Sequence, residues 1–411
     1  MALLQSVPRR LLLTGTPATS RLFDSFNLFQ VLRPGLLAAN KYEYKARFFD
    51  GASSSAALKY PKQLPLLVHR FLMVRRTKRQ VLLSTRPEQA VGADTPLTST
   101  LPRQVMDELP HRIDEQVDLP LALGHAREAI RAFGAAPLPP DDLARAEGGD
   151  ADDSAPDSLE AAGVKAKAHR LGLLKAVALS EPESWLHARL RTLATAAADA
   201  RQRGERPRKL VVFAHHERVM DLLEKTIGER LADAATPASG GGDGESAPWH
   251  GVRIDGSHSG VAKNALLDAF RDNDSCLAAL LSIKACGTGV DGLQHTADHA
   301  VFVELPETYA LAHQAAARLH RSGQTQRVLL TWLLACGPPR RGRLLAGADA
   351  GDSGGDEASA LLRECSSADA RMWASLQRNA EEIDEASSSF ACRSRRCAFG
   401  VLHQSCSDCH L

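Results

Sequence analysis

The chain has 411 residues, of which 44% are hydrophobic and 24% charged, and this length is enough for two or three domains with separate cores. The composition excludes fibrous, collagen-like and wholly disordered proteins. Lys and Arg number 50 against 49 Asp and Glu, so the net charge of +1 indicates no polyanionic partner. No run of eighteen apolar residues occurs, so we expect no membrane-spanning helix and no membrane partner.

The charge is unevenly distributed along the chain. Residues 1–85 contain fourteen Lys or Arg and three acidic residues, a local balance of +11. Such asymmetry suggests a polyanionic partner, although a solvated basic face would also explain it. Residues 1–23 hold three Arg and no acid, which fits a mitochondrial presequence, but a folded strand and turn explain this stretch better.

The first motif is a predicted strand over 10–14 that ends in Thr14-Gly15-Thr16-Pro17. Gly15 permits a tight turn and Pro17 suits a first helical position. Hydroxyl and free N–H groups at a helix start can bind an anion. A strand that leads into a capped helix is also common without any function, so this motif alone is weak.

Residues 71–82 form a second motif, which alternates apolar and basic side chains. Its apolar set is Phe71, Leu72, Val74, Val81 and Leu82, and its basic cluster is Arg75, Arg76, Lys78 and Arg79. A basic cluster on an amphipathic element can neutralise phosphates, and a solvated helix face is an equally good explanation.

Three polar segments divide the chain, and we expect them to be linkers or disordered inserts: 137–163, 232–248 and 337–358. Between them, short apolar runs alternate with helical patterns. The runs at 210–214, 251–254, 277–282 and 300–304, with helices at 218–231 and 266–270, predict an open α/β fold with a parallel sheet over about 205–335. Functional loops should then lie at the carboxyl ends of the strands.

Several of these loops carry polar residues or glycines. His215-His216-Glu217 follows one strand; a metal site is conceivable, but adjacent residues rarely bind one ion, so loop residues at a strand end are the better explanation. Another strand ends at 282–289, where Gly287 and Gly289 let the backbone approach a ligand.

The segment 314–324 places Gln314, Arg318 and Arg321 on one face of a predicted helix, because they are spaced at i, i+4 and i+7. Two guanidinium groups one turn apart suit the charge on a transferring phosphoryl group. A purely structural Arg pair is the alternative, but it does not explain the Gly323-Gln324 stop that follows.

Cysteines crowd the end of the chain at Cys392, Cys397, Cys406 and Cys409, next to His410. The closing Cys-x2-Cys spacing suits structural Zn²⁺, whereas the opening Cys-x4-Cys is less usual. Free thiols on a disordered basic tail are the alternative prediction.

Taken in order, these segments resemble the Swi/Snf-type helicase-like ATPases of superfamily 2. The resemblance covers roughly 1–335: motif III at 11–17, the Met-Val-Arg-Arg-Thr-Lys element at 71–82, and motifs IV, IVa, V and VI at 209–216, 254–257, 282–289 and 314–324. Val-Phe-Ala-His-His (212–216), Arg-Ile-Asp-Gly-Ser (253–257), Arg-Pro-Gly-Leu (33–36) and Phe-Asp-Gly (49–51) look most like the annealing-helicase (HARP-like) branch.

The resemblance implies two RecA-like lobes with ATP and Mg²⁺ between them and DNA across both. By family likeness, Arg318 and Arg321 would be arginine fingers supported by Gln314 and Gln324, and Gly287, Gly289 and Gly323 would contact the cofactor. DNA contacts would come from Thr14, Gly15, Thr16, Arg75, Arg76, Lys78, His215 and Lys284.

The resemblance also implies the domain organisation. We expect a truncated first lobe, a linker, a complete second lobe, an insert, a closing helix and a cysteine-rich tail, at 1–136, 137–163, 164–336, 337–360, 361–391 and 392–411 respectively.

Two departures limit the resemblance. No G-x-x-x-x-G-K-[ST] phosphate loop and no Asp-Glu-x-His motif occurs, and alanines at 315–317 stand where the family carries Glu and Asp. We therefore expect that Met1 begins inside a longer protein and that this polypeptide does not hydrolyse ATP by itself.

The predicted function is part of a nuclear, ATP-dependent DNA translocase or annealing helicase, acting in fork repair or chromatin remodelling with replication or repair proteins. The alternatives are a non-catalytic DNA-binding or scaffold protein and a zinc-dependent interaction module.

Overall fold

A single six-stranded sheet forms the centre of the molecule. The computed structural model of the chain describes residues 7, 9–14, 22–50, 58–60, 63–74, 109–133, 157–235, 248–284, 290–336 and 353–387. The strands are β1 (Arg112–Pro120), β2 (Lys209–Ala214), β3 (His250–Ile254), β4 (Cys276–Ser282), β5 (Ala297–Phe302) and β6 (Val328–Cys336). They lie in the order β1-β6-β5-β2-β4-β3, and neighbouring strands pair in parallel, which confirms the predicted α/β fold.

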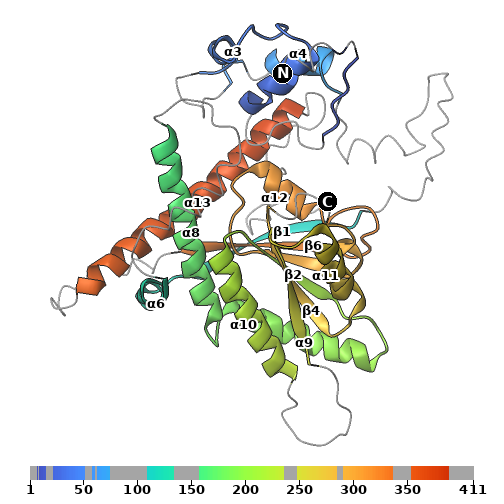
Figure 1. Cartoon of the computed structure of the whole chain (residues 1–411), viewed down its shortest axis with the longest axis vertical. Helices are drawn as coiled ribbons and strands as arrows, with labels where there is room; N and C mark the ends of the chain where they lie inside the picture. The colour runs from blue at the N-terminus through green and yellow to red at the C-terminus, as the bar shows by residue number, and fades with distance from the viewer. Residues whose placement is uncertain are drawn as a thin grey trace, which may run out of the picture.

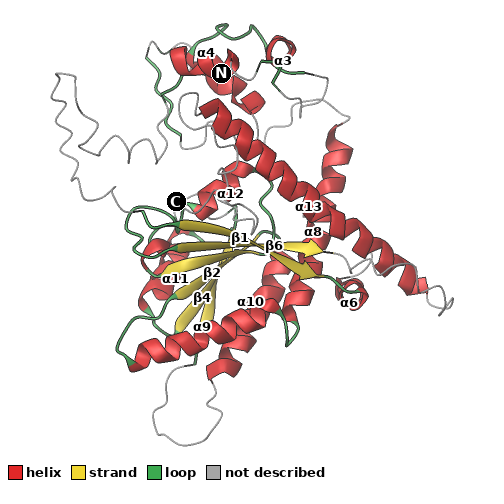
Figure 2. Ribbon diagram, turned by 180° about the vertical axis from the view of Figure 1, so that it is seen from behind, coloured by secondary structure: helices red, strands yellow, loops and turns green. Residues whose placement is uncertain are grey.

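Helices cover both faces of this sheet (Figure 2). One face packs against α8 (Asp157–Ser180), α9 (Trp185–Gln202) and α10 (Glu217–Ala235), and the other against α11 (Gly260–Asp272) and α12 (Tyr309–Ala316). Along β2, alternate side chains enter the two cores, Leu210 and Val212 on one side and Val211 and Phe213 on the other. Continuous apolar strands are therefore required here, because each strand is buried on both faces.

Helix α13 (Ser353–Ser387) joins the two cores. Its earlier turns place Leu362 and Cys365 in the α8 side of the core, and its later turns place Trp373 and Leu376 in the α12 side. Between them, Asp369 accepts a hydrogen bond of 2.7 Å from the backbone N–H of Ala335 in β6. The helix thus passes the carboxyl end of β6 (Figure 1).

A separate helical cluster precedes the sheet. It contains η1 (Leu22–Ser25), α2 (Phe26–Leu32), α3 (Lys41–Phe48) and α4 (Gln63–Phe71), and it lies beside one end of α13 (Figure 1). Its core is aromatic, with the Tyr44 ring in contact with Phe26, Phe48 and Phe49. Helix α3 begins with a reciprocal cap, because Asn40 accepts from the Glu43 N–H and Glu43 accepts from the Ala39 N–H, both at 2.9 Å.

The structure corrects two predictions about the first segment. Residues 10–14 form no strand; Leu11 and Leu13 are exposed, and no described strand lies beside them to supply ladder hydrogen bonds. The predicted amphipathic element at 71–82 starts where α4 ends, at Phe71, and Val74 is exposed rather than part of an apolar face. Residues 75–82 lie outside the described part of the chain.

The linker predictions are also wrong at their ends. Helix α8 begins at Asp157, before the predicted end of the linker at 163. Helix α10 continues to Ala235, and α13 begins at Ser353, so both extend into segments predicted as inserts. Ala, Glu and Leu in these stretches support helix extension despite the polar composition. The remaining predicted insert residues lie outside the described ranges.

The sheet also extends earlier along the chain than the predicted start of the second lobe at 164. Strand β1 pairs with β6 along its whole length, and α6 (Leu123–Phe133) packs on α8 and α13. The described residues between 22 and 74 form helices and one isolated bridge, Phe49 with Leu58, but no sheet. None of the described helices combines the length and apolarity that crossing a membrane requires.

Candidate functional site

Three neighbouring strands bring together two of the eight predicted DNA contacts, His215 and Lys284. Ala214 at the end of β2 lies beside Ser282 of β4, and Phe213 lies beside Phe302 of β5. Because the strands are parallel, the loops that follow them emerge at one edge of the sheet. His215 follows β2, and Lys284 follows β4.

Glu307, which follows β5, links these two residues. Its Oε1 atom lies 3.5 Å from His215 Nε2 and 3.7 Å from Lys284 Nζ. The Lys284 and Glu307 side chains are both exposed by more than a third, whereas His215 is largely covered. The structure therefore places His215 and Lys284 around one carboxylate at the surface.

Glu304 lies beneath this surface and was not predicted from the sequence. Its Oε2 atom accepts hydrogen bonds from the backbone N–H groups of His215, at 2.6 Å, and His216, at 3.0 Å. Its Oε1 atom lies 2.6 Å from His216 Nδ1. Burial alone would raise the pKa of Glu304, but the hydrogen bonds from His216 and the two backbone amides outweigh it and hold the pKa below its ordinary value.

Helix α8 closes the other side of this carboxylate. The His169 ring stacks on the His216 ring, with centroids 4.4 Å apart and planes 8° from parallel. A Cβ atom at Gly172 would lie 2.3 Å from Glu304 Oε1, so the close approach of α8 requires glycine here. Sequence reasoning could have found Glu304 only by pairing a strand-end acid with the strand-end histidines of a neighbouring strand.

The two predicted arginine fingers lie together, but the predicted helical face is wrong. Helix α12 ends at Ala316. The N–H group of Ala317 still bonds to the His313 carbonyl, but those of Arg318 and Leu319 bond to the third residue before them. This tighter turn does not keep the 3.6-residue period.

Both guanidinium groups contact the segment that follows the predicted glycine loop. Arg318 Nη1 donates to the Val290 carbonyl at 3.0 Å, and Arg321 Nη1 donates to Asp291 Oδ1 at 2.8 Å. Gln314, predicted to support them, lies partly exposed in α12.

Gln324 and Gly323 form the turn that ends this segment. The buried Gln324 amide donates to the Ala297 carbonyl at 3.0 Å and accepts from the N–H groups of Thr325 and Gln326. Gly323 has φ +92°, and a Cβ atom there would lie 2.7 Å from His295 Cε1. These contacts give both residues a structural role. The support of the arginine fingers by Gln324 and the cofactor contact of Gly323 stay predictions.

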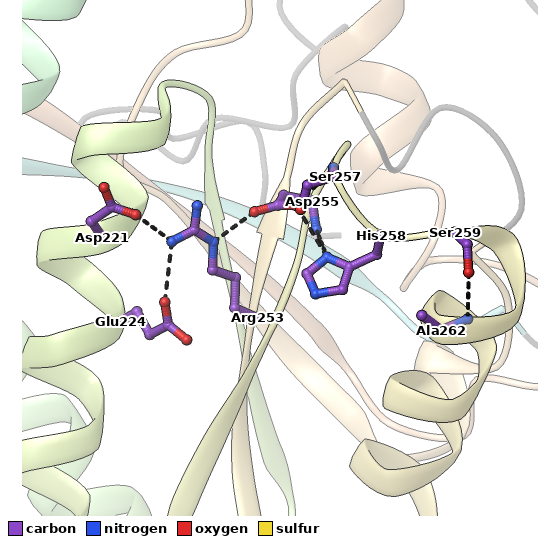
Figure 3. Close-up of polar contacts among 8 residues, drawn as sticks. All are labelled: Asp221, Glu224, Arg253, Asp255, Ser257, His258, Ser259 and Ala262. Atoms are coloured by element: carbon purple, nitrogen blue, oxygen red, sulfur yellow. Dashed lines mark hydrogen bonds and ion pairs between the residues drawn. The ribbon is translucent and has the colours of Figure 1, made fainter.

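A second polar cluster lies at the end of β3, one of the two edge strands of the sheet (Figure 3). Arg253 Nη1 contacts Asp221 at 2.5 Å and Glu224 at 3.1 Å, both on α10, and Arg253 Nε contacts Asp255 at 2.7 Å. Asp255 also accepts from the Ser257 N–H at 2.9 Å. The cluster fixes the turn that leads into α11.

The remaining predicted residues are less informative. Thr14 is exposed. Eleven other predicted site residues lie outside the described part of the chain: Gly15, Thr16, Arg75, Arg76, Lys78, Gly287, Gly289, Cys392, Cys397, Cys406 and Cys409. In the described ranges no group of three or more His, Cys, Asp or Glu is arranged to hold a metal ion.

The chain is similar to several known proteins. Residues 202–323 match the family model described as helicase conserved C-terminal domain. A Drosophila melanogaster protein, "SWI/SNF-related matrix-associated actin-dependent regulator of chromatin subfamily A-like protein 1", is 26% identical over 336 residues, which cover 80% of this chain and 34% of that protein. The human "DNA annealing helicase and endonuclease ZRANB3" is 30% identical over 129 residues, which cover 31% of this chain and 10% of that protein.

Among solved structures, this chain matches the C-terminal part of the Fun30 ATPase domain. The match covers 63% of this chain and 99% of that chain, with 17% sequence identity and a TM-score of 0.33. The chain spans about a third of the length of the curated relatives that it matches most extensively.

Proposed function

We propose that this chain, a Snf2-type helicase-like protein of superfamily 2, supplies the DNA-binding and arginine-finger lobe of an ATP-dependent motor on duplex or forked DNA. The proposal depends on one observation: His215 and Lys284 both contact the Glu307 carboxylate. These residues lie at the carboxyl edge of the sheet, where the parallel strands β2, β4 and β5 end. The names of the relatives, which include a DNA annealing helicase, support DNA as the substrate.

Glu307 suggests how the surface would bind DNA. A carboxylate between an imidazole and an ammonium group occupies the position that a backbone phosphate would take. DNA would displace Glu307 from Lys284 and His215. Contacts of this kind position the protein on the duplex and carry no sequence information.

Arg318 and Arg321 would contact the nucleotide. Their guanidinium groups suit the anionic phosphates of ATP, whose charge they would stabilise during phosphoryl transfer. The described residues offer no acidic cluster for Mg²⁺. By family likeness, a phosphate loop and Mg²⁺ ligands would complete this site.

A non-catalytic DNA-binding or scaffold protein is the second candidate function, favoured by the absence of a G-x-x-x-x-G-K-[ST] sequence from the 411 residues. Both functions imply a nuclear site and replication or repair partners. DNA-stimulated phosphate release by the natural gene product separates them. A motor loses this activity in Arg318→Ala and Arg321→Ala, whereas a scaffold lacks it in the wild type.

Fluorescence anisotropy with labelled duplex and forked DNA tests the DNA surface. Lys284→Ala should weaken binding to both substrates and reduce the slope of log K against log salt by about one. The matched control is Lys225→Ala, because Lys225 is an exposed lysine of α10 that pairs with Glu229 away from the strand ends. Equal affinity and slope in the two variants, or no binding by the wild type, would contradict the proposal.

A further inference from the structure

We propose that Glu304 is a positioning residue, which holds the His215–His216 loop in the shape that presents His215 to a DNA phosphate. This inference rests on the proposed function of the carboxyl edge. Glu304 does not reach the surface itself, since only about 5% of it is exposed. It would act through the loop.

The hydrogen bonds of Glu304 fix both the backbone and one side chain of the loop. Two successive N–H groups converge on Oε2, and His216 Nδ1 binds Oε1, so both carboxylate oxygens are used. Successive N–H groups that converge in this way form an anion-binding concavity. An ionised carboxylate only accepts hydrogen bonds, so His216 Nδ1 carries the proton and the imidazole orientation is set.

The position of Glu304 is itself enforced from several sides. Gly172 of α8 leaves the space that Oε1 occupies. The neighbouring residue Val303 is held at both backbone groups: its carbonyl accepts from Lys175 Nζ at 3.0 Å, and its N–H donates to the Phe213 carbonyl at 3.0 Å. Titratable groups near the loop or near Glu304 include His169 of α8, which stacks on His216, Glu307 after β5, which contacts His215 and Lys284, and Lys175 of α8, which contacts the neighbouring Val303.

A stabilising role alone explains this carboxylate poorly. Burying a charge is costly, and a buried ionic group can often be replaced by apolar residues of similar volume without loss of stability. Here the charge lies under the loop that carries His215, whose ring reaches Glu307 at the surface. The buried acid therefore specifies one loop conformation next to the surface assigned to DNA.

The test is Glu304→Gln in the full chain. Glutamine keeps the size, but one of its two polar atoms donates, so it cannot accept from the two backbone N–H groups and from His216 Nδ1 together. We expect DNA affinity to fall about tenfold, as for the loss of a charge-assisted hydrogen bond. Glu304→Asp, which keeps the charge, should recover part of the affinity, and Glu229→Gln on the exposed face of α10 is the matched control.

A double-mutant cycle separates positioning from general stability. If Glu304 acts through His215, Glu304→Gln should cause little further loss of DNA affinity in a His215→Ala background. Amide NMR signals of residues 215 and 216 should shift in Glu304→Gln while those of α11 stay in place. Should Glu304→Gln fail to fold, His216→Ala removes one hydrogen bond of the same carboxylate and should show the same non-additivity with His215→Ala.

Additive losses, or wild-type affinity in Glu304→Gln, would overturn the role of Glu304 and leave the proposed function intact. Absence of DNA binding by the wild type would overturn the proposed function and this role together.

Discussion

The Glu304 cluster and the Arg253 cluster both tie a loop at a strand end to a neighbouring helix, but only the first is buried. Glu304 lies between β2, β5 and α8, whereas Arg253 pairs with Asp221 and Glu224, whose side chains are more than half exposed. Water competes for the exposed pairs, so each contributes about 0–1 kcal/mol, while removing one partner of a buried ion pair costs about 3–5 kcal/mol. The same kind of contact is therefore expected to stabilise the fold more at the centre of the sheet, where it is buried, than at the β3 edge, where it is exposed.

The largest effect on stability is expected from breaking the buried ion pair next to Glu304. Lys175 pairs with Asp369, and its Nζ also donates to the carbonyls of Val303 and Leu333, at 3.0 and 2.7 Å. Lys175→Met leaves the Asp369 charge buried without its ion-pair partner, and we expect the free energy of unfolding to fall by about 3–5 kcal/mol in urea denaturation. Lys175→Met with Asp369→Leu should recover much of the loss; a double variant as unstable as the single one would contradict the account.

A smaller loss of stability is expected from a substitution where the Glu304 carboxylate contacts α8. Gly172→Ala places a methyl group against Glu304 Oε1, so either α8 or the carboxylate must move. We expect destabilisation of about 1–3 kcal/mol, the range for overpacking a core, measured by thermal or urea unfolding. Gly228→Ala on α10, where a Cβ meets no atom within 4 Å, is the control and should not destabilise the protein. Equal stability of the two variants would show that the fit around Glu304 is loose.

The contribution of the turn after β3 to the free energy of unfolding should depend on pH. Burial alone would raise the pKa of Asp255, but hydrogen bonds from Ser257 and Arg253 lower it from 3.8 to about 2. Because the folded-state pKa is the lower one, the stabilisation is complete above pH 3.8 and is lost as the pH falls toward 2. Asp255→Asn should remove about 2 kcal/mol at neutral pH and flatten the acid limb of the stability curve. An acid limb identical to that of the wild type would refute this assignment.

The smallest effect is expected at the exposed partners of Arg253. Asp221→Asn should change the unfolding free energy by less than about 1 kcal/mol, because Glu224 and Asp255 still contact the guanidinium group. The change should shrink further in high salt, which screens exposed charges. A loss comparable to that of Lys175→Met would remove the distinction between the two clusters.

The sequence was sufficient to predict β2, β3, β4 and β5, but not β1, at the edge opposite β3, or its neighbour β6. Strands β2 and β4 are buried along their whole length, so their unbroken apolar runs indicate them directly. Strand β1 has charges at four of its nine positions and no unbroken apolar run, so its sequence, RIDEQVDLP, gives no comparable signal. It is held by long-range contacts, such as Asp114 with the indole N–H of Trp332, at 3.0 Å.

The candidate site was predictable to a similar degree. His215 and Lys284 were predicted as DNA contacts from the family resemblance. Their positions after parallel strands explain why they lie close together, because the loops that follow such strands emerge at one edge of the sheet. The roles of Glu304 and Lys175 could not be predicted from the sequence, because their partners are distant in the chain. A separation of 88 residues lies between Glu304 and His216, and one of 158 residues lies between Lys175 and Leu333. The i, i+4, i+7 spacing of Gln314, Arg318 and Arg321 predicted one helical face, and this prediction was wrong because α12 ends before both arginines.

The most direct test of the account is an amide chemical-shift map of the chain during titration with a short DNA duplex. We predict that the largest changes occur at residues 215, 216 and 284, with smaller ones at 255–258 and little change along α9. Changes confined to α9 and the helical cluster at 22–71, with none at the carboxyl ends of β2 and β4, would contradict it.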